Sequence, residues 1–206
     1  MIIERAMQSK DYDRVIKLAL EGEAKDKVLP GLVNDWRECR YRAYKRSGKL
    51  DEQRGLAMNF ILSGSFAYYK ELKSTYNDGE WTVVYPKIIF RIEEQKSFRG
   101  DIYANILIEE GEKKKLLKYV EKSPLLVESY YKHLVPEFKQ EVFDLFLKYI
   151  EQASARAGNR RDYQGVCAII NNLKKAGGKE QALGIKQKLF MKYANRPAFR
   201  DELIRV

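Results

Sequence analysis

The sequence predicts an all-α protein that forms an irregular solenoid of stacked helix pairs. Apolar residues recur at spacings of three, four and seven along most of the 206-residue chain, which is the period of a helix with one buried face. Glycine or proline interrupts these runs at short intervals, so the helices must be short. No segment is convincingly a strand, and stacking in pairs is the simplest way for short helices to bury their apolar faces.

The N-terminal part of the chain shows this spacing clearly. Its longest run predicts a helix over 29–47, with Pro30 in the first turn and Gly48 as the stop. Proline is tolerated in a first turn because the N–H that it lacks would have no helical partner there. The same spacing predicts three other helices, over 12–22, 50–64 and 66–76.

One segment near the middle of the chain could be taken for a strand. Residues 81–85 (WTVVY) are aromatic or β-branched, which favours β structure. However, Trp81, Ile88 and Ile92 belong to an apolar series with helical spacing that continues through Pro86 without a change of phase. We therefore predict one helix across Pro86, bent there because the ring removes a donor and clashes with the preceding turn.

Prolines and capping residues mark the helices of the second half. Pro124, Pro136 and Pro197 each stand at the start of an apolar run and are expected in first turns. Asn159 is expected to cap a helix that the glycines at 177–178 end. The helices predicted here cover 102–111, 112–122, 124–134, 136–150, 163–173, 182–193 and 197–204.

Three connections between these helices have a similar sequence. Gly48-Lys49-Leu50, Gly111-Glu112-Lys113 and Gly178-Lys179-Glu180 each follow one helix and begin another. We expect the same helix–turn–helix joint to be reused at all three. Because the intervals between them are unequal, the pattern favours a degenerate repeat over a fixed-period array.

Composition suits one folded domain over 1–206. The chain is 45% hydrophobic and 12% aromatic, and no stretch rich in Pro, Gly or Ser divides it. The net charge of +10 is uneven, because residues 153–206 hold twelve Lys or Arg against four Asp or Glu, and the rest holds 27 against 25. This difference suggests possible sub-blocks at 1–152 and 153–206. Clustered positive charge attracts nucleic acid or acidic protein, although it is equally common on a solubilising surface.

The sequence favours a soluble cytoplasmic protein without catalytic chemistry. No apolar run is long enough to cross a membrane, and no secretory signal precedes the first helix. Cys39 and Cys167 resemble small core residues, and a disulfide between them is the less favoured alternative. With His133 as the single histidine and no phosphate-binding glycine motif, we expect no enzyme activity, no metal and no cofactor.

Two groups of basic residues are candidates for binding a partner. Arginines interleaved with aromatic residues suit phosphate contacts and base stacking, and such a group occurs within 36–46. The alternative is that its aromatic residues face the core while its arginines are solvated or pair with acids. The second group lies in the C-terminal third and is expected to form a continuous, solvent-exposed positive patch, because few acids are nearby. The candidates are Arg37, Arg40 and Arg42 in the first group, and Arg156, Arg160, Arg161, Lys174 and Lys175 in the second.

Several segments resemble the C-terminal helical-repeat region of bacterial SWIM-type zinc-finger proteins. They are NRRDYQGVC at 159–167, LKKAGG at 173–178, RPAF at 196–199, PGL at 30–32 with Trp36, and IEEGE at 108–112. In that family a zinc module with Cys-x-Cys and Cys-x-His pairs lies upstream of the helices. This chain contains neither pair. The resemblance therefore implies the C-terminal part of a longer protein, and it places zinc binding on no residue here.

Two functions follow as hypotheses. The leading one is a non-catalytic helical scaffold that binds a protein partner, which could include the upstream zinc module of the parent chain. The alternative is an accessory domain that binds nucleic acid through the basic C-terminal surface. Steep weakening of binding with added salt would distinguish the second hypothesis from the first.

Overall fold

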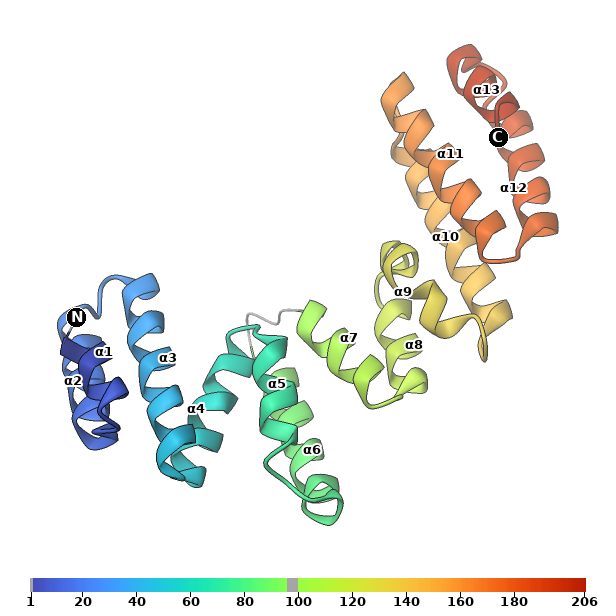
Figure 1. Cartoon of the computed structure of the whole chain (residues 1–206). Coiled ribbons are helices and arrows are strands. Elements are labelled where there is room, and N and C mark those ends of the chain that lie inside the picture. Colours follow the sequence, from blue (N-terminus) through green and yellow to red (C-terminus); the bar gives the residue numbers. More distant parts are fainter. Residues whose placement is uncertain (1, 96–99) are drawn as a thin grey trace. The chain divides into compact units, whose positions relative to one another are not determined.

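The computed structural model describes residues 2–95 and 100–206. This part of the chain contains thirteen α-helices and one short 3₁₀ helix, and no strand (Figure 1). The prediction of an all-α protein is therefore confirmed. The helices are α1 (Ile2–Gln8), α2 (Tyr12–Lys25), α3 (Pro30–Ser47), α4 (Leu50–Leu62), α5 (Phe66–Lys73), α6 (Asp78–Glu93), α7 (Gly100–Glu109), α8 (Lys113–Glu121), η1 (Pro124–Leu126), α9 (Val127–Leu134), α10 (Lys139–Arg156), α11 (Arg160–Lys175), α12 (Lys179–Lys192) and α13 (Pro197–Ile204).

The chain divides into two compact units, Met1–Ile106 and Leu107–Val206. Most contacts between helices within each unit join neighbours in the sequence, as in a helical array or bundle. The charge boundary at residue 153 lies inside α10.

In the first unit, α1, α2 and α3 enclose a small core. Ile3, Val15 and Ala43 are buried there, and Trp36 packs against them. Gly22 allows α2 to approach this ring, since a Cβ at that position would lie 2.4 Å from two of its carbons. The helix α1 was not predicted from the apolar spacing, although it supplies Ile3 and Ala6 to this core.

The segment that resembles a strand lies within the helix α6. Asn77 caps it, and a capping box with Glu80 satisfies the first N–H groups. The helix continues through Pro86 and buries Trp81, Ile88 and Ile92 on one face. The prediction of one helix across Pro86 is confirmed.

Five connections between consecutive helices use the same turn. In each, a residue with positive φ follows the first helix, and the next residue caps the second helix. The capping residue donates its N–H to the carbonyl five residues earlier, which is the six-to-one bond of a Schellman motif. The pairs are Lys10 with Asp11, Gly48 with Lys49, Gly64 with Ser65, Gly111 with Glu112, and Gly177 with Gly178.

The expectation of a reused joint is thus confirmed, except that the third predicted joint lies one residue earlier in the chain. At the last connection the positive φ belongs to Gly177, and Gly178 already caps α12. The assignment of Pro136 to a first turn is wrong, because α10 begins at Lys139. The Leu134 carbonyl accepts from the N–H groups of Glu137 and Phe138, which closes α9 in a turn that contains Pro136.

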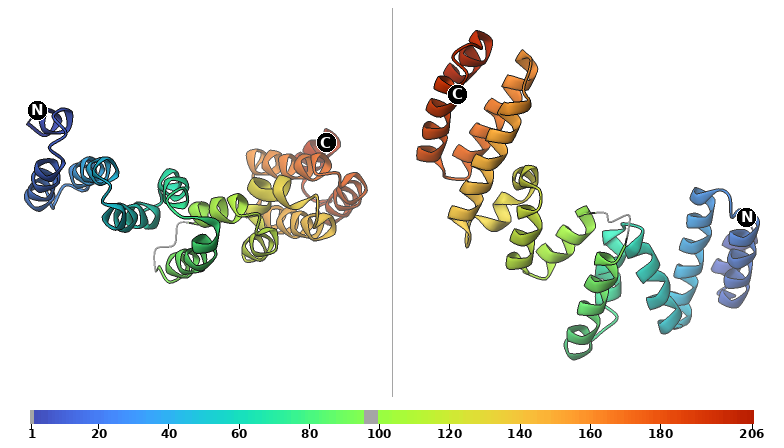
Figure 2. Two further views of the ribbon diagram at one scale, coloured as in Figure 1. Left: turned by 60° about the horizontal axis from the view of Figure 1, so that its bottom comes forward. Right: turned by 180° about the vertical axis from the view of Figure 1, so that it is seen from behind.

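In the second unit, α11 is the central helix. It packs against α10, α12 and α13, and the views of Figure 2 agree on this arrangement. The predicted cap at Asn159 is confirmed as a capping box with Asp162. Fully buried Phe146, Ile170 and Phe199 come from three of these helices. The core therefore holds α10 and α11 together, while Arg156 of α10 and Gly165 and Ala168 of α11 remain exposed.

Candidate interaction surface

The candidate binding surface of the second unit follows one face of α10. Tyr149, Ala153 and Arg156 are spaced by four and three residues, so they share this face. A cavity lies on each side of it, and all three residues line both cavities. We call the two cavities and the helix face between them the α10 groove.

Small residues form much of the cavity between α9, α10 and α11, whose volume is about 510 Å³. Gly165 and Ala168 of α11 are exposed, and a Cβ on Gly165 would meet nothing within 4 Å. A main chain can approach such a surface closely because few side-chain atoms stand in its way. The lining residues are Glu128, Tyr149, Ala153, Arg156, Ala157, Asp162, Gly165, Val166, Ala168 and Ile169.

The cavity on the other side of α10 has a volume of about 450 Å³ and is bounded by the turn after α8. Its apolar side comes from Pro124 and Leu125, of which Leu125 is 54% exposed. Lys122 lies at its edge and is exposed. The groove thus offers apolar and cationic contacts together.

Both acidic residues of the groove are engaged within the fold. Glu128 Oε1 accepts from Asn172 Nδ2 at 2.6 Å, and Asp162 Oδ2 accepts from three N–H groups of Gly158 and Asn159. Burial, followed by the nearby Glu128 charge, raises the pKa of Tyr149, so its hydroxyl is protonated at neutral pH. Within the described residues, no ion pair involves Arg156 or Lys122.

The basic residues predicted from the C-terminal third have different surroundings. Arg156, Arg160, Arg161 and Lys175 are exposed as expected, whereas Lys174 is half-buried. The expectation that acids are too scarce to neutralise them is wrong for Arg160. Its Nε lies 2.7 Å from Glu202 Oε1, and its Nη2 lies 3.8 Å from Asp201 Oδ2.

The length of α11 also separates these cations. Arg160 and Arg161 begin the helix and Lys174 and Lys175 end it. At 1.5 Å per residue, the two pairs stand about 20 Å apart along the helix axis. Of the five predicted residues, the structure places Arg156 alone in the lining of the α10 groove.

Acids neutralise part of the basic group on α3. Arg37 Nε and Arg40 Nη2 lie 3.2 Å and 3.0 Å from the two carboxylate oxygens of Glu23 on α2. This confirms the alternative in which these arginines pair with acids on a neighbouring helix. They join α2 to α3, and Trp36 and Tyr41 of the same helix face inward.

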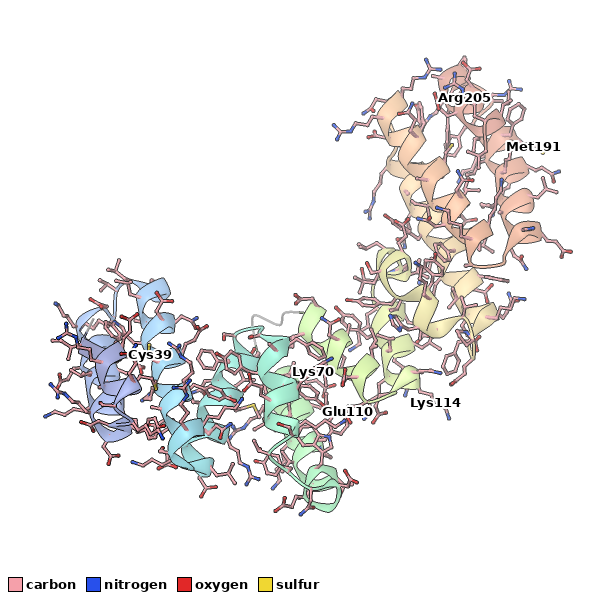
Figure 3. The ribbon with its side chains drawn as sticks, in the orientation of Figure 1. Cys39, Lys70, Glu110, Lys114, Met191 and Arg205 are labelled. Atoms are coloured by element: carbon pink, nitrogen blue, oxygen red, sulfur yellow. The ribbon has the colours of Figure 1, made fainter. Side chains whose placement is uncertain are left out.

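Arg42 lies apart from that ion-pair network. Its Nη2 is 3.3 Å from Cys39 Sγ, and both residues line a cavity of about 510 Å³ between α1 and α3. Cys39, labelled in Figure 3, is a free thiol, as is the buried Cys167.

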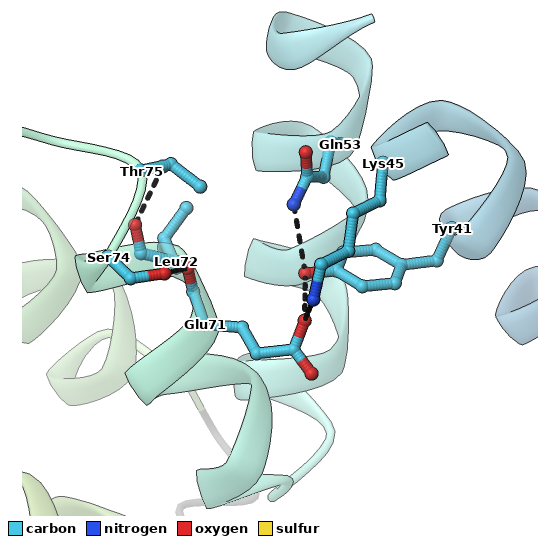
Figure 4. A network of polar contacts seen from close by, with 7 residues as sticks. All are labelled: Tyr41, Lys45, Gln53, Glu71, Leu72, Ser74 and Thr75. Atoms are coloured by element: carbon cyan, nitrogen blue, oxygen red, sulfur yellow. Dashed lines mark hydrogen bonds and ion pairs between the residues drawn. The ribbon is translucent and has the colours of Figure 1, made fainter. Parts of the chain in front are cut away.

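A polar network in the first unit joins the buried Tyr41 and Gln53 to the exposed Lys45 and the half-buried Glu71. The Tyr41 hydroxyl donates to Glu71 Oε2 at 2.9 Å and accepts from Gln53 Nε2 at 3.3 Å, while Lys45 Nζ lies 2.8 Å from the same carboxylate oxygen (Figure 4). Burial raises the pKa of Tyr41 to about 12. The Lys45 hydrogen bond is the main cause that lowers the pKa of Glu71. These contacts join α3, α4 and α5.

Sequence reasoning missed most residues of the α10 groove. The available signal was the pair Gly165 and Ala168, small residues on the polar face of a strongly amphipathic helix. Tyr149 lies in the apolar run of the helix predicted over 136–150, and the structure leaves it half-buried.

The described residues contain neither a group of metal-ligating side chains nor a membrane-spanning helix. Nowhere in 2–95 and 100–206 do three or more His, Cys, Asp or Glu gather in a way that could hold a metal ion. Within the same ranges, each helix is too short or too polar to cross a membrane. His133 is exposed on α9.

Comparisons with protein-family models, with curated proteins and with solved structures found no match to this chain.

Proposed function

We propose that this chain is a non-catalytic helical scaffold, an irregular solenoid of stacked helix pairs, that binds a peptide segment of a protein partner in the α10 groove. The observation that carries the proposal is the pair of cavities along the exposed face of α10. The reused Schellman joint supports the repeat architecture. Resemblance to SWIM-type proteins adds the upstream zinc module as a candidate partner.

The shape of the groove favours a peptide over a small molecule. Small-molecule sites usually enclose most of the ligand surface. Here Leu125, Gly165 and Ala168 are exposed, and the hollows lie on both sides of one helix face. A segment of chain can follow that face and place side chains into either cavity.

Nucleic acid is the less favoured partner. Single-stranded nucleic acid is usually held by cations together with exposed aromatic rings. In the second unit, Tyr163 and Phe199 stack on each other in the core, with ring centroids 4.6 Å apart. Arg160 is already paired with two carboxylates. The alternative is still tested below, because Arg156 and Arg161 are exposed and could contact phosphate groups.

A steric block in the groove tests the proposal. Gly165→Gln places a side chain on the groove wall, and Gly184→Gln adds the same side chain to α12 at an exposed glycine outside the groove. The probe is a phage-displayed library of random 12-residue peptides, selected on the wild-type chain. Peptides selected by the wild type should lose binding to Gly165→Gln and keep it for Gly184→Gln.

Two outcomes would contradict the proposal. One is that the library yields no specific binder. The other is that Gly165→Gln binds the selected peptides as well as the wild type does. Titration of labelled single- and double-stranded 20-mer DNA at low salt serves as the parallel measurement. Binding of DNA without selection of any peptide would support the nucleic-acid alternative instead.

A further inference from the structure

We infer that the α10 groove selects peptide segments that carry a carboxylate, and that Arg156 is the residue that binds it. This inference rests on the proposed function and names the chemistry of the partner. It depends on three properties of the groove: which of its charged groups already have hydrogen-bond partners, where its cations lie, and what surrounds them.

The acidic and basic side chains of the groove differ in how many hydrogen-bond partners they already have within the fold. The carboxylate of Asp162 completes the capping box of α11, where it accepts from Gly158 N at 2.9 Å and from Asn159 Nδ2 at 2.9 Å. The carboxylate of Glu128 holds Asn172 Nδ2 at 2.6 Å. Both acids keep their charge, since their donors are neutral amides, but these hydrogen bonds occupy Glu128 Oε1 and Asp162 Oδ2. No ion pair among the described residues engages Arg156 or Lys122, so these two cations are the charged groups that a ligand carboxylate can bind.

Arg156 is placed to meet a ligand in either cavity. It lies at the last position of α10, it is exposed, and it lines the cavities on both sides of the helix. Its planar guanidinium can form two parallel hydrogen bonds to one carboxylate, which gives geometric selectivity as well as attraction. Lys122 adds a second positive charge at the edge of the smaller cavity.

The charge of the whole unit acts in the same direction. Residues 107–206 hold twenty Lys or Arg against thirteen Asp or Glu, a net charge of +7. A field of this sign raises the local concentration of acidic segments and speeds their encounter. It would repel basic ones.

The apolar part of the groove distinguishes a peptide from a simple anion. Leu125 is 54% exposed beside Tyr149, and Ala153 lies between Tyr149 and Arg156 on the helix face. A ligand that satisfies both parts carries an apolar side chain a few residues from its Asp or Glu. A mononucleotide or a lone phosphate would leave the apolar part of the groove uncovered.

The test uses the same 12-residue peptide library and two matched variants of the full chain. Arg156→Gln removes the groove cation. Arg161→Gln removes an exposed cation that lies in the first turn of α11 and outside the lining of both cavities. Circular dichroism checks that both variants keep the helical content of the wild type.

We expect the selected peptides to be enriched in Asp or Glu next to apolar residues. Arg156→Gln should weaken their binding about 10- to 100-fold, the range for a lost charged hydrogen bond. Replacing the peptide's own Asp or Glu by the amide should weaken binding to the wild type by a similar factor, and Arg161→Gln should change it less than about 3-fold.

The possible failures are distinguishable. Peptides that are selected, and that Gly165→Gln blocks, but that lack acidic residues or bind Arg156→Gln unchanged, overturn this inference and leave the proposed function standing. Equal weakening by Arg156→Gln and Arg161→Gln also overturns it, because attraction would then be nonspecific. The absence of any selected peptide overturns the inference together with the proposed function.

Discussion

Arg160 Nε donates to Glu202 Oε1 at 2.7 Å and thereby ties the first turn of α11 to α13. Arg205 Nη1 reaches the same oxygen at 3.3 Å. The carboxylate is almost wholly buried, with 6% of the side chain exposed, whereas the Arg160 side chain is 53% exposed. Arg160 therefore holds the last helix in place, although the sequence predicted that its side chain would be unpaired and available to bind a partner.

This ion pair predicts that α13 loosens in acid. The Arg160 hydrogen bond is the main cause that lowers the pKa of Glu202 below its ordinary value of 4.5. A lowered folded-state pKa contributes stability that is present above the unfolded pKa and lost as pH falls through the folded one. Hydrogen exchange of the α13 amides should therefore quicken below about pH 4.5, relative to their intrinsic rates.

The control for that prediction is Glu202→Gln. It removes the titrating group and should give fast α13 exchange with little further dependence on acid pH. An exchange profile of the wild type that stays flat from neutral pH to pH 3 would show that the ion pair does not hold α13.

Two glycine-to-alanine variants in the first unit should have opposite effects. Gly22→Ala forces a Cβ to within 2.4 Å of the Trp36 ring, which is held by its own hydrogen bond to Asp26 at 2.8 Å. Overpacking of this kind costs about 1–3 kcal/mol, against a helix-propensity gain of about 1 kcal/mol. A Cβ at Gly55 on α4 would meet nothing within 4 Å, so Gly55→Ala has only the gain in helix propensity.

Urea unfolding followed by tryptophan fluorescence measures both variants. Trp36 and Trp81 lie in the first unit, so the signal follows that unit. We expect Gly22→Ala to lower the free energy of unfolding by about 1 kcal/mol and Gly55→Ala to raise it by about 0.5–1 kcal/mol. A stabilising Gly22→Ala would mean that the ring moves aside freely.

The Tyr41 network predicts a loss of stability in alkali. The folded-state pKa of Tyr41 is about 12, above the ordinary value of 10.0. A raised folded-state pKa contributes stability that is complete below the unfolded pKa and lost as pH rises through the folded one. The free energy of unfolding of the first unit should therefore fall between pH 10 and 12.

Tyr41→Phe separates this contribution from other titrations. The variant leaves Gln53 and Glu71 without their tyrosine partner, so we expect a loss of about 1 kcal/mol at neutral pH. Its unfolding free energy should then depend less on pH above 10 than that of the wild type. Parallel pH profiles for the two proteins would contradict the assignment.

The sequence predicted local structure better than it predicted contacts between helices. The stops at Gly48 and Gly111 and the cap at Asn159 each depend on a few adjacent residues, and all three were found. Glu202 lies 42 residues from Arg160 in the sequence, so their pairing depends on how α13 packs against α11. The α10 groove escaped detection for the same reason, since its two sides come from separate helices.

One of the five Schellman joints has no glycine at its positive-φ position. Lys10 has a φ of 61°, and among the described residues it is the one non-glycine with positive φ. Holding a residue with a Cβ in the left-handed conformation costs about 1–2 kcal/mol. Replacing it with glycine removes this cost, but glycine loses more conformational entropy on folding, so only part of the gain remains. Lys10→Gly should therefore stabilise the first unit by about 0.5–1 kcal/mol.

Gly48→Ala provides the matched reverse change at an equivalent joint. Gly48 has a φ of 73°, and a Cβ there would meet nothing within 4 Å, so the cost is conformational and not steric. We expect a loss of about 1 kcal/mol in urea unfolding followed by tryptophan fluorescence. Opposite signs for the two variants would show that one joint geometry governs both sites. If Lys10→Gly were neutral or destabilising while Gly48→Ala cost 1 kcal/mol, the turn at Lys10 would owe its stability to something other than the Schellman geometry.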